Sequence, residues 1–303
     1  MTVTRAYRSA TLRVGNTVFE WGKRTYVMGI INATPDSFSG DGVLAAGEDW
    51  VQAAVAQGVR FVAEGAHILD VGGESTRPGA QPIDAEEEIR RVVPVIRALR
   101  DAVDVPISVD TYKAVVAEAA LEAGADMVND VWALRMDPDM AAVVARRGVP
   151  IILMHNRSRP KNAVQEARLG GRYVGIEYEN LIEDVKRELM ESVALARAAG
   201  IPDEHIILDP GIGFGKTVEQ NLELIDRLDA LADLGYPILL GPSRKSFIGY
   251  TLDLPPDRRV EGTAAAVAIG IDRGADIVRV HDVLYMARVA AMTDAIVRRD
   301  KRV

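Results

Sequence analysis

Eight short apolar runs, each followed by a longer stretch with helical periodicity, constrain the fold of this chain more than any other feature. Such an alternation builds parallel βα units, because parallel strands need a long crossover connection. The runs are continuously apolar, which suits a parallel sheet whose outer face is covered by helices. The predicted strands are 25–32, 67–73, 105–111, 126–131, 149–156, 205–211, 236–243 and 276–283.

The segments between these runs carry helical patterns with defined ends. In the stretch 86–100, helical spacing places Ile89, Val92, Val93 and Ile96 on one face. Four returns to a strand share one signature, "AEGAHIL", "LEAGADMV", "ARRGVPIIL" and "DRGADIV". A glycine at that position supplies the left-handed residue that ends a helix.

Eight such units at this length predict a (β/α)8 TIM barrel, for which about 250 residues are typical. We expect one domain over 1–303, with the barrel at 25–299 and a short N-terminal β-hairpin at 11–22 that closes its lower end. A doubly wound open sheet is the alternative. The stretch "GIINATPDSF" lacks the G-x-G-x-x-G loop that usually follows the first strand of such a sheet.

Composition excludes several classes of protein. The net charge of −8 opposes binding to nucleic acid, which requires a basic surface. The chain has no cysteine, so disulfides, thiolate nucleophiles and cysteine-based zinc sites are excluded. No apolar run is long enough to span a membrane, and "MTVTRAYRSA" lacks the apolar core of a signal peptide. We therefore expect a cytoplasmic protein without membrane contacts.

Almost every predicted strand ends in a polar or charged group. One such ending is ordinary turn or capping chemistry. A parallel barrel, however, brings all these ends to one mouth, where barrel enzymes have their active sites. The endings are Asn32, Glu74 to Arg77, Asp110, Asn129 with Asp130, His155, Asp209, Ser243 to Lys245, and Arg279 with His281.

These endings fall into two chemical groups. Asp110, Asn129 and Asp209, expected on neighbouring strands, suit the edge of a flat heterocycle that presents N–H donors and a carbonyl. A separate cationic group near Asn32 predicts a phosphate or diphosphate site and consists of Arg77, Lys245, Arg279 and His281. Two loop aromatic residues, Phe38 and Phe214, could cover a ring, although loop packing explains Phe38 equally well.

The stretch "DPGIGFGKT" resembles a phosphate-binding P-loop, but the pattern requires glycine where this chain has Pro210. Its glycines are better explained by close approach of the backbone to a ligand. No Ser-His-Asp arrangement stands out, and four scattered histidines do not make a zinc site.

Eight motifs in order, covering residues 26–283, resemble those of the bacterial dihydropteroate synthases, a pterin-binding family. The motifs are "GIINATPDSFSGDG", "DVGGESTRPG", "ISVDTYK", "VNDV", "LMHN", "LDPGIGFGK", "GPSRKSFIG" and "VRVHDV". The resemblance implies a transferase of folate biosynthesis. It implies that 6-hydroxymethyl-7,8-dihydropterin diphosphate and 4-aminobenzoate are joined to 7,8-dihydropteroate with release of diphosphate. It also implies a Mg²⁺ cofactor and a homodimer.

The resemblance assigns roles to individual residues. Asp110, Asn129, Asp209 and Lys245 match the pterin site, which Phe214 borders, and Asn32, Arg279 and His281 match the diphosphate site, with Asn32 near Mg²⁺. The aminobenzoate and loop set consists of Phe38, Thr76, Arg77, Pro78 and Ser246.

The expected chemistry is a largely dissociative cleavage of the C–O bond, because an electron-rich pterin can stabilise a cation. Asp110 would offset the positive charge that develops. Mg²⁺, Arg279 and His281 would stabilise charge on the departing diphosphate. The implied catalytic set is thus Asp110, Lys245, Arg279 and His281.

Three positions depart from the common family pattern: Asp41 is displaced by one position in "DSFSGDG", Asn156 stands in "LMHN", and Pro242 stands in "GPSRKS". Two alternatives keep the fold and change the activity. A methyltransferase acting on methyltetrahydrofolate would not need "STRPG", "SRKS" or "RVHD". A catalytically silent paralogue would bind pterin without turnover.

Overall fold

The central element of this computed structural model, which describes residues 6–33, 50–77 and 79–299, is an eight-stranded parallel sheet. The strands run in the order β10-β7-β6-β5-β4-β3-β12-β11. A parallel bridge between Leu208 and Ile238 joins the two edges, so the sheet closes into a barrel. The predicted fold class is confirmed, and the open-sheet alternative is wrong. The strands are β3 (Tyr26–Asn32), β4 (Ile68–Gly72), β5 (Ile107–Asp110), β6 (Met127–Asp130), β7 (Ile151–Met154), β10 (Ile206–Asp209), β11 (Leu239–Leu240) and β12 (Ile277–Val280).

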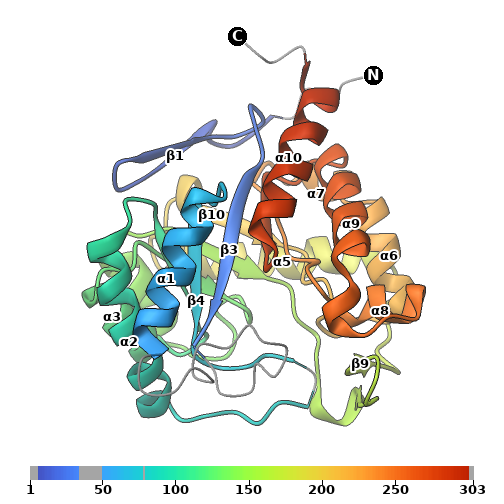
Figure 1. Ribbon diagram of the computed structural model, residues 1–303, viewed down its shortest axis with the longest axis horizontal. Coiled ribbons are helices and arrows are strands. Elements are labelled where there is room, and N and C mark those ends of the chain that lie inside the picture. Colours follow the sequence, from blue (N-terminus) through green and yellow to red (C-terminus); the bar gives the residue numbers. More distant parts are fainter. Residues whose placement is uncertain (1–5, 34–49, 78, 300–303) are drawn as a thin grey trace.

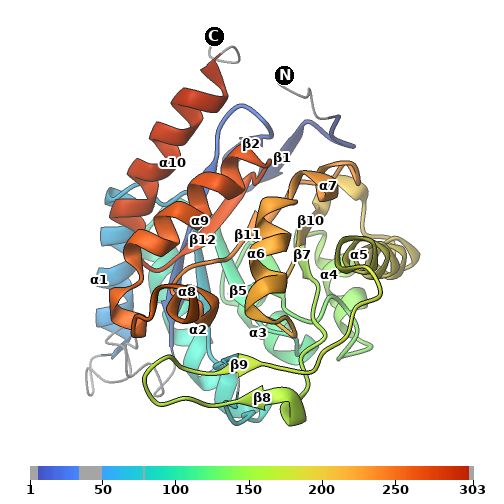
Figure 2. The same cartoon turned by 90° about the vertical axis from the view of Figure 1, so that its right-hand side faces the viewer.

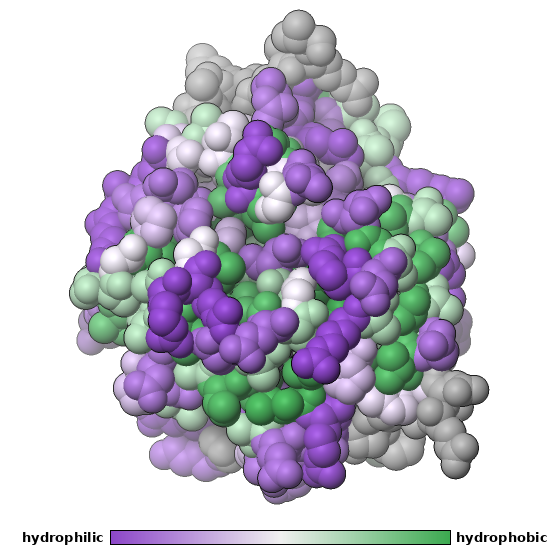
Figure 3. Space-filling model, turned by 90° about the vertical axis from the view of Figure 1, so that its left-hand side faces the viewer, coloured by the Kyte–Doolittle hydropathy of each residue, from purple (hydrophilic) through white to green (hydrophobic). Residues whose placement is uncertain are grey.

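Helices surround the barrel, and each crossover returns the chain to the start of the next strand (Figures 1 and 2). Figure 3 shows one outer face, on which hydrophilic side chains are interspersed with hydrophobic ones. No helix among the described residues is both long and apolar enough to cross a membrane. The helices are α1 (Trp50–Ala63), α2 (Ala85–Ala102), α3 (Ala114–Glu122), α4 (Met140–Arg147), α5 (Leu181–Ala198), α6 (Val218–Asp226), α7 (Asp229–Ala232), α8 (Ser246–Leu252), α9 (Val260–Asp272) and α10 (Val283–Val297).

Helix α2 illustrates how the sequence sets each helix. Asp84 caps its N-terminus by accepting a hydrogen bond from the Glu87 backbone, and three glutamates occupy its first turn, where the helix dipole favours negative charge. Of the predicted face, Val92 and Ile96 are buried, while Ile89 and Val93 are partly buried at its edge. The buried face also includes Val95 and Leu99, which the prediction left out.

The glycines predicted to end helices do so in the left-handed conformation. Gly65, Gly124, Gly148 and Gly274 have φ values of 108°, 111°, 65° and 102°. Each lets the chain reverse from a helix into the following strand within a few residues.

A two-stranded antiparallel hairpin, β1 (Thr11–Val14) with β2 (Thr17–Glu20), crosses the end of the barrel opposite the carboxyl ends of the strands (Figure 1). Its Leu12 and Phe19 join Trp21 in an apolar cluster with side chains from the starts of the barrel strands, such as Ile68 and Ile207. The predicted closure of the lower end is confirmed. A second small hairpin pairs β8 (Ala163–Val164) with β9 (Arg172–Tyr173).

Candidate active site

Alternation along the strands separates the barrel interior into two layers. In β10 and β12 the inward positions carry an apolar residue first, Ile207 or Ile277, and a charged one two residues later, Asp209 or Arg279. Because side chains alternate with a period of two, the apolar layer lies toward the hairpin and the polar layer toward the mouth. Most of the predicted strand endings therefore converge at the mouth, whereas Asp130 and His155 do not line it.

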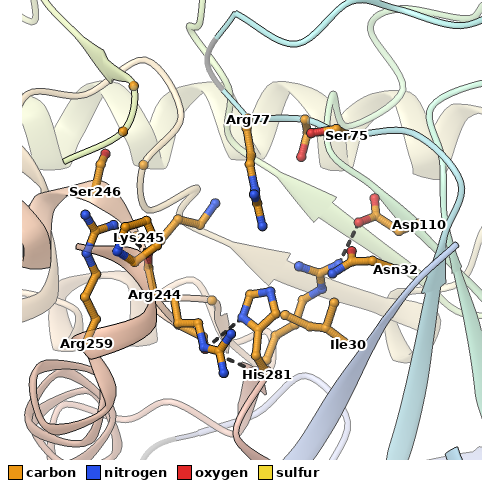
Figure 4. A pocket seen from close by; sticks show the side chains of 18 of the residues that line it. Ile30, Asn32, Ser75, Arg77, Asp110, Arg244, Lys245, Ser246, Arg259 and His281 are labelled. Atoms are coloured by element: carbon orange, nitrogen blue, oxygen red, sulfur yellow. Dashed lines mark hydrogen bonds and ion pairs between the residues drawn. The ribbon is translucent and has the colours of Figure 1, made fainter. Parts of the chain in front are cut away.

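The mouth contains a cavity of about 210 Å³ and a smaller adjoining one of about 20 Å³ (Figure 4). Thr76, Asp110, Lys245 and Arg279 line both. Phe38 and Pro78 lie outside the described residues. Every other candidate lines one of the two: Asn32, Arg77, Ser246 and His281 the larger, and Asn129, Asp209 and Phe214 the smaller.

Arg279 joins the two groups that the sequence analysis kept apart. Its Nε donates to Asp70 Oδ2 at 2.6 Å, and its Nη2 donates to Asp110 Oδ2 at 2.6 Å. The expectation of a separate cationic group is therefore wrong, because Arg279 on β12 faces the carboxylates of β4 and β5 across the mouth. The prediction that Asp110, Asn129 and Asp209 lie on neighbouring strands is wrong for Asp209. Strand β7 lies between β6, which carries Asn129, and β10, which carries Asp209.

Asp70 is a site residue that the sequence analysis missed. Its side chain is fully buried, and it accepts hydrogen bonds from Arg279 and from Asn129 Nδ2 at 3.1 Å. The available signal was a carboxylate inside the apolar run "HILDV", where only a paired charge is tolerated. Asn129 Oδ1 has no hydrogen-bond partner among the described residues, which leaves an acceptor for a ligand.

Burial favours the neutral forms of two carboxyl groups and one lysine amine at the mouth. It raises the pKa of Asp110 to about 7, against the opposing effect of Arg279 and with a contribution from Asp70. It raises the pKa of Asp209 to about 6, opposed by a hydrogen bond from the Gly211 backbone. It lowers the pKa of Lys245 to about 8.

The loop after β10 brings an aromatic ring beside a cation. The Lys245 ammonium lies 4.0 Å from the centre of the Phe214 ring, a favourable cation–π arrangement. Gly211 and Gly213 have positive φ, and a Cβ on Gly211 would lie 1.8 Å from the His155 carbonyl oxygen. The glycines of this motif therefore permit close approach to the protein's own backbone and side chains.

His281 is held by the turn before α8. Ser243 Oγ accepts from the His281 backbone at 3.1 Å and lies 3.0 Å from Nδ1. Burial lowers the pKa of His281 well below its usual value, so the ring is neutral. The same turn is fixed by a two-bond ion pair between Arg244 and Asp282, at 2.7 and 3.0 Å.

The loop "GGESTRPG" is anchored at Glu74, a contact that the sequence did not indicate. Glu74 accepts from Tyr112 Oη at 2.9 Å, from Lys113 Nζ at 2.5 Å and from the Ile83 backbone at 3.2 Å. The base of the loop is thereby tied to the turn between β5 and α3 and to the segment before α2, while Arg77 extends into the cavity (Figure 4).

Three other residues that the sequence analysis singled out, Asn156, Pro242 and His155, stabilise the fold. Asn156 is buried, donates to the Val131 carbonyl at 3.0 Å and accepts from the Ser158 backbone at 2.8 Å. Pro242 begins the turn whose Lys245 backbone N–H donates back to its carbonyl. His155 lines neither cavity and lies buried against Glu188. Asp41 lies outside the described residues.

A Mg²⁺ ion is compatible with the donors at the mouth. The described residues contain no cluster of three or more histidines, aspartates or glutamates that could hold a metal ion. The side-chain oxygen of Asn32 at the end of β3 is nevertheless a hard ligand in the larger cavity. Mg²⁺ is commonly bound by one or two protein groups together with substrate phosphates and water, which fits this arrangement.

Comparison with known proteins agrees with this geometry. The pterin-binding enzyme family matches residues 28–281. Dihydropteroate synthase of Clostridium beijerinckii is 51% identical over 289 residues, 95% of this chain and all of that protein. The structure of the Clostridium difficile dihydropteroate synthase with pteroic acid is 48% identical, with a TM-score of 0.82 over 92% of this chain and 98% of that chain. The Xanthomonas albilineans enzyme with 4-aminobenzoic acid is 41% identical, with a TM-score of 0.84 over 95% and 98%.

The family match over residues 28–281 places this closed (β/α)8 barrel among the pterin-binding enzymes. Within that class, the chain belongs to the dihydropteroate synthase family. It is a transferase with dihydropteroate synthase function in folate biosynthesis.

Proposed function

We propose that the mouth of this barrel binds 6-hydroxymethyl-7,8-dihydropterin diphosphate and 4-aminobenzoate together and joins them to 7,8-dihydropteroate. The observation that carries the proposal is the pairing of Arg279 with Asp70 and Asp110, because it brings a cation suited to an anion next to carboxylates suited to a pterin. Relatives with solved structures hold 4-aminobenzoic acid or 7,8-dihydropteroate.

The pterin would occupy the smaller cavity. Asp209 and Asn129 offer acceptors to the amino and ring N–H groups of the pterin, and the Lys245 ammonium donates to its carbonyl or ring nitrogen. The Phe214 ring borders the same space and supplies an apolar surface for the flat heterocycle.

The diphosphate would lie in the larger cavity against Asn32, Arg279 and His281. Asn32 would also hold the Mg²⁺ ion. When bound there, Mg²⁺ neutralises charge on phosphate oxygens. Arg279 is shared with two carboxylates, so it positions the anion with fixed N–H groups as well as with its charge.

The aminobenzoate would lie at the outer side of the larger cavity, between Thr76, Arg77 and Ser246. The Arg77 guanidinium and the Ser246 hydroxyl suit its carboxylate. Phe38 and Pro78 remain predicted contributors to this region of the site.

The reaction then follows from the charges. The C–O bond to the diphosphate breaks and its electron pair leaves with the diphosphate. The carboxylate of Asp110 stabilises the cation that develops on the pterin. The amine nitrogen of the aminobenzoate forms the new C–N bond and then loses a proton. No covalent intermediate with the enzyme is required.

We further propose one domain that contains the whole site, a cytoplasmic location and a homodimer. The helices α9 and α10 pack side by side on one flank of the barrel (Figures 1 and 2). Exposed apolar side chains on both helices support the proposed dimer. Ile269, Tyr285, Met292 and Ile296 are all exposed on these two helices.

Binding measurements test the proposed site without relying on turnover. The pterin diphosphate and Mg²⁺ are titrated calorimetrically, with and without an analogue of aminobenzoate that lacks the aromatic amine and therefore cannot form the C–N bond. We expect the analogue to bind more tightly once the diphosphate is present. Equal affinity with and without the pterin diphosphate would contradict a shared site. A methyltransferase would instead bind methyltetrahydrofolate and ignore the analogue.

A further inference from the structure

Lys216 ends the motif "DPGIGFGK", and its amine does not face the cavities. The residue is only 2% exposed. Its Nζ lies 3.0 Å from the Gly211 carbonyl, 3.1 Å from the Phe214 carbonyl and 3.0 Å from His155 Nδ1. The amine thus folds back into the loop that precedes it.

The three contacts match the donors of an ammonium group. A protonated lysine has three N–H donors and no acceptor. It can donate to both carbonyls and to His155, provided that Nδ1 of the ring accepts. His155 must then accept through Nδ1 and donate through Nε2, which lies 3.0 Å from Glu188 Oε2. Burial and the charge of Lys216 lower the pKa of His155 to about 3, which keeps the ring neutral as this arrangement requires.

Glu188 completes a chain of contacts that neutralises the buried lysine. Arg157 Nε donates to its Oε1 at 2.9 Å. Although burial opposes ionisation of Glu188, hydrogen bonds from His155 and Arg157 lower its pKa below the usual value. Glu188 thus lies on the far side of the His155 ring from the lysine. Burial lowers the pKa of Lys216 to about 7, and the charges of Asp209 and Glu188 oppose this shift, so these carboxylates offset part of the cost of burying the ammonium.

The loop between the two tied carbonyls carries the aromatic side of the pterin pocket. Gly211, Gly213 and Gly215 have φ values of 73°, 80° and 62°. Glycines have little conformational preference of their own, so the path of such a loop depends on external contacts. Phe214 lies within it, and its ring contacts Lys245.

We propose that Lys216 is a positioning residue for the pterin site. Its ammonium, oriented by neutral His155, fixes the 211–214 loop so that the Phe214 ring and the Lys245 ammonium keep their places beside the pterin. This inference rests on the proposed pterin site. Lys216 belongs to a motif that resembles a P-loop, but in this proposal it fixes a loop of the protein and does not contact a phosphate.

Lys216→Met tests the proposal, because methionine fills a similar volume without N–H donors. Losing hydrogen bonds from a charged group should raise the KM for the pterin diphosphate about ten- to a hundredfold. The KM for 4-aminobenzoate should change less than about twofold, since that subsite is formed by other loops. Lys186→Met is the matched control, because Lys186 forms an ion pair with the Glu183 carboxylate at 3.8 Å on the outer helix α5.

Chemical rescue separates positioning from a general loss of structure. In Lys216→Ala, added ethylammonium should enter the vacated space, contact the same carbonyls and restore the pterin KM at least partly. A purely structural defect would not respond to an amine. If Lys216→Met does not fold, Lys216→Gln keeps two N–H donors without the charge, and the same criteria apply to it.

The direct binding of 6-hydroxymethylpterin, followed by its fluorescence, keeps this test independent of turnover. A folded variant with wild-type affinity for the pterin would overturn the proposal. So would an equal rise of KM for both substrates, or a defect that ethylammonium leaves unchanged. Absence of product with the wild-type protein would contradict the proposed function but leave the binding comparison intact.

Discussion

Two carboxylates at the mouth, Asp70 and Asp209, are buried, and each accepts a hydrogen bond from the protein. Arg279 between Asp70 and Asp110 is the clearest case, since an unpaired buried charge would cost several kcal/mol. The same burial that requires pairing raises the pKa of Asp110, so substrate binding and electrostatics at this residue are coupled.

Replacing Asp110 by asparagine should reduce kcat about 10²- to 10³-fold, because the variant lacks the charge that stabilises the developing cation. Dihydropteroate formation at saturating substrate concentrations measures the effect. The matched control is Asp203→Asn, which removes a carboxylate from an ion pair with Arg197 at the surface. Unimpaired turnover of Asp110→Asn would show that another group stabilises the cation.

Pterin binding should weaken as the pH falls from about 7.5 to about 5. The pKa values of Asp110 and Asp209 are raised to about 7 and about 6, and a protonated carboxyl loses its charge and part of its acceptor capacity. Fluorescence titration with 6-hydroxymethylpterin across this range tests the direction. Asp209→Asn should lose the part of the decline that lies near pH 6. An affinity that does not vary with pH would be inconsistent with these carboxylates as ligands.

The elements that stabilise the barrel and the loops that form its active site lie at opposite ends of the barrel axis. The N-terminal hairpin and the lower layer form an apolar cluster, whereas the loops at the carboxyl ends of the strands carry the polar site. Changes at one end should therefore leave the function of the other intact.

Phe19→Ala in the hairpin should destabilise the protein by about 3–5 kcal/mol without altering either KM. The Phe19 ring is almost fully buried and lies 4.8 Å from that of Tyr26. Thermal unfolding together with steady-state kinetics measures both effects. Val18→Ala, on the exposed side of the same hairpin, is the control and should change little. A large rise in KM with unchanged stability would contradict the separation.

The elements themselves could be predicted from the sequence because strands and helices differ in hydrophobic period and the helix-ending glycines mark their boundaries. The segment 236–243 shows the limit, since only Leu239–Leu240 form a strand between Pro237 and Pro242, which lack an N–H for the ladder. Strand order around the barrel places β7 between β6 and β10, so the expectation that Asn129 and Asp209 lie on neighbouring strands is wrong.

Contacts across the barrel were harder to predict than membership of the site. Alternation and strand ends identify Asp110 and Arg279 separately, but their ion pair joins residues 169 positions apart. No local sequence pattern predicts a contact between residues so far apart in the chain. The same holds for Lys216, whose partner His155 lies 61 positions away.

For the whole molecule, the proposed homodimer makes a direct prediction. Met292 and Ile296 on α10 are 62% and 54% exposed, and charges placed there would have to be buried between two copies. The double variant Met292→Lys, Ile296→Lys should sediment as a monomer at concentrations where the wild type is a dimer. Val59→Lys with Val115→Lys, on α1 and α3, is the control. Equal sedimentation of wild type and variant would exclude this face as the interface.

The measurement that tests the account most directly is turnover by the purified protein. The chain is incubated with 6-hydroxymethyl-7,8-dihydropterin diphosphate, 4-aminobenzoate and Mg²⁺, and 7,8-dihydropteroate is quantified by mass spectrometry. The geometry of one site that combines pterin, diphosphate and aminobenzoate groups predicts product that disappears when either substrate or Mg²⁺ is omitted. Measurable binding of the pterin diphosphate without any product would contradict the account, because the site would then bind its substrate without catalysing the reaction.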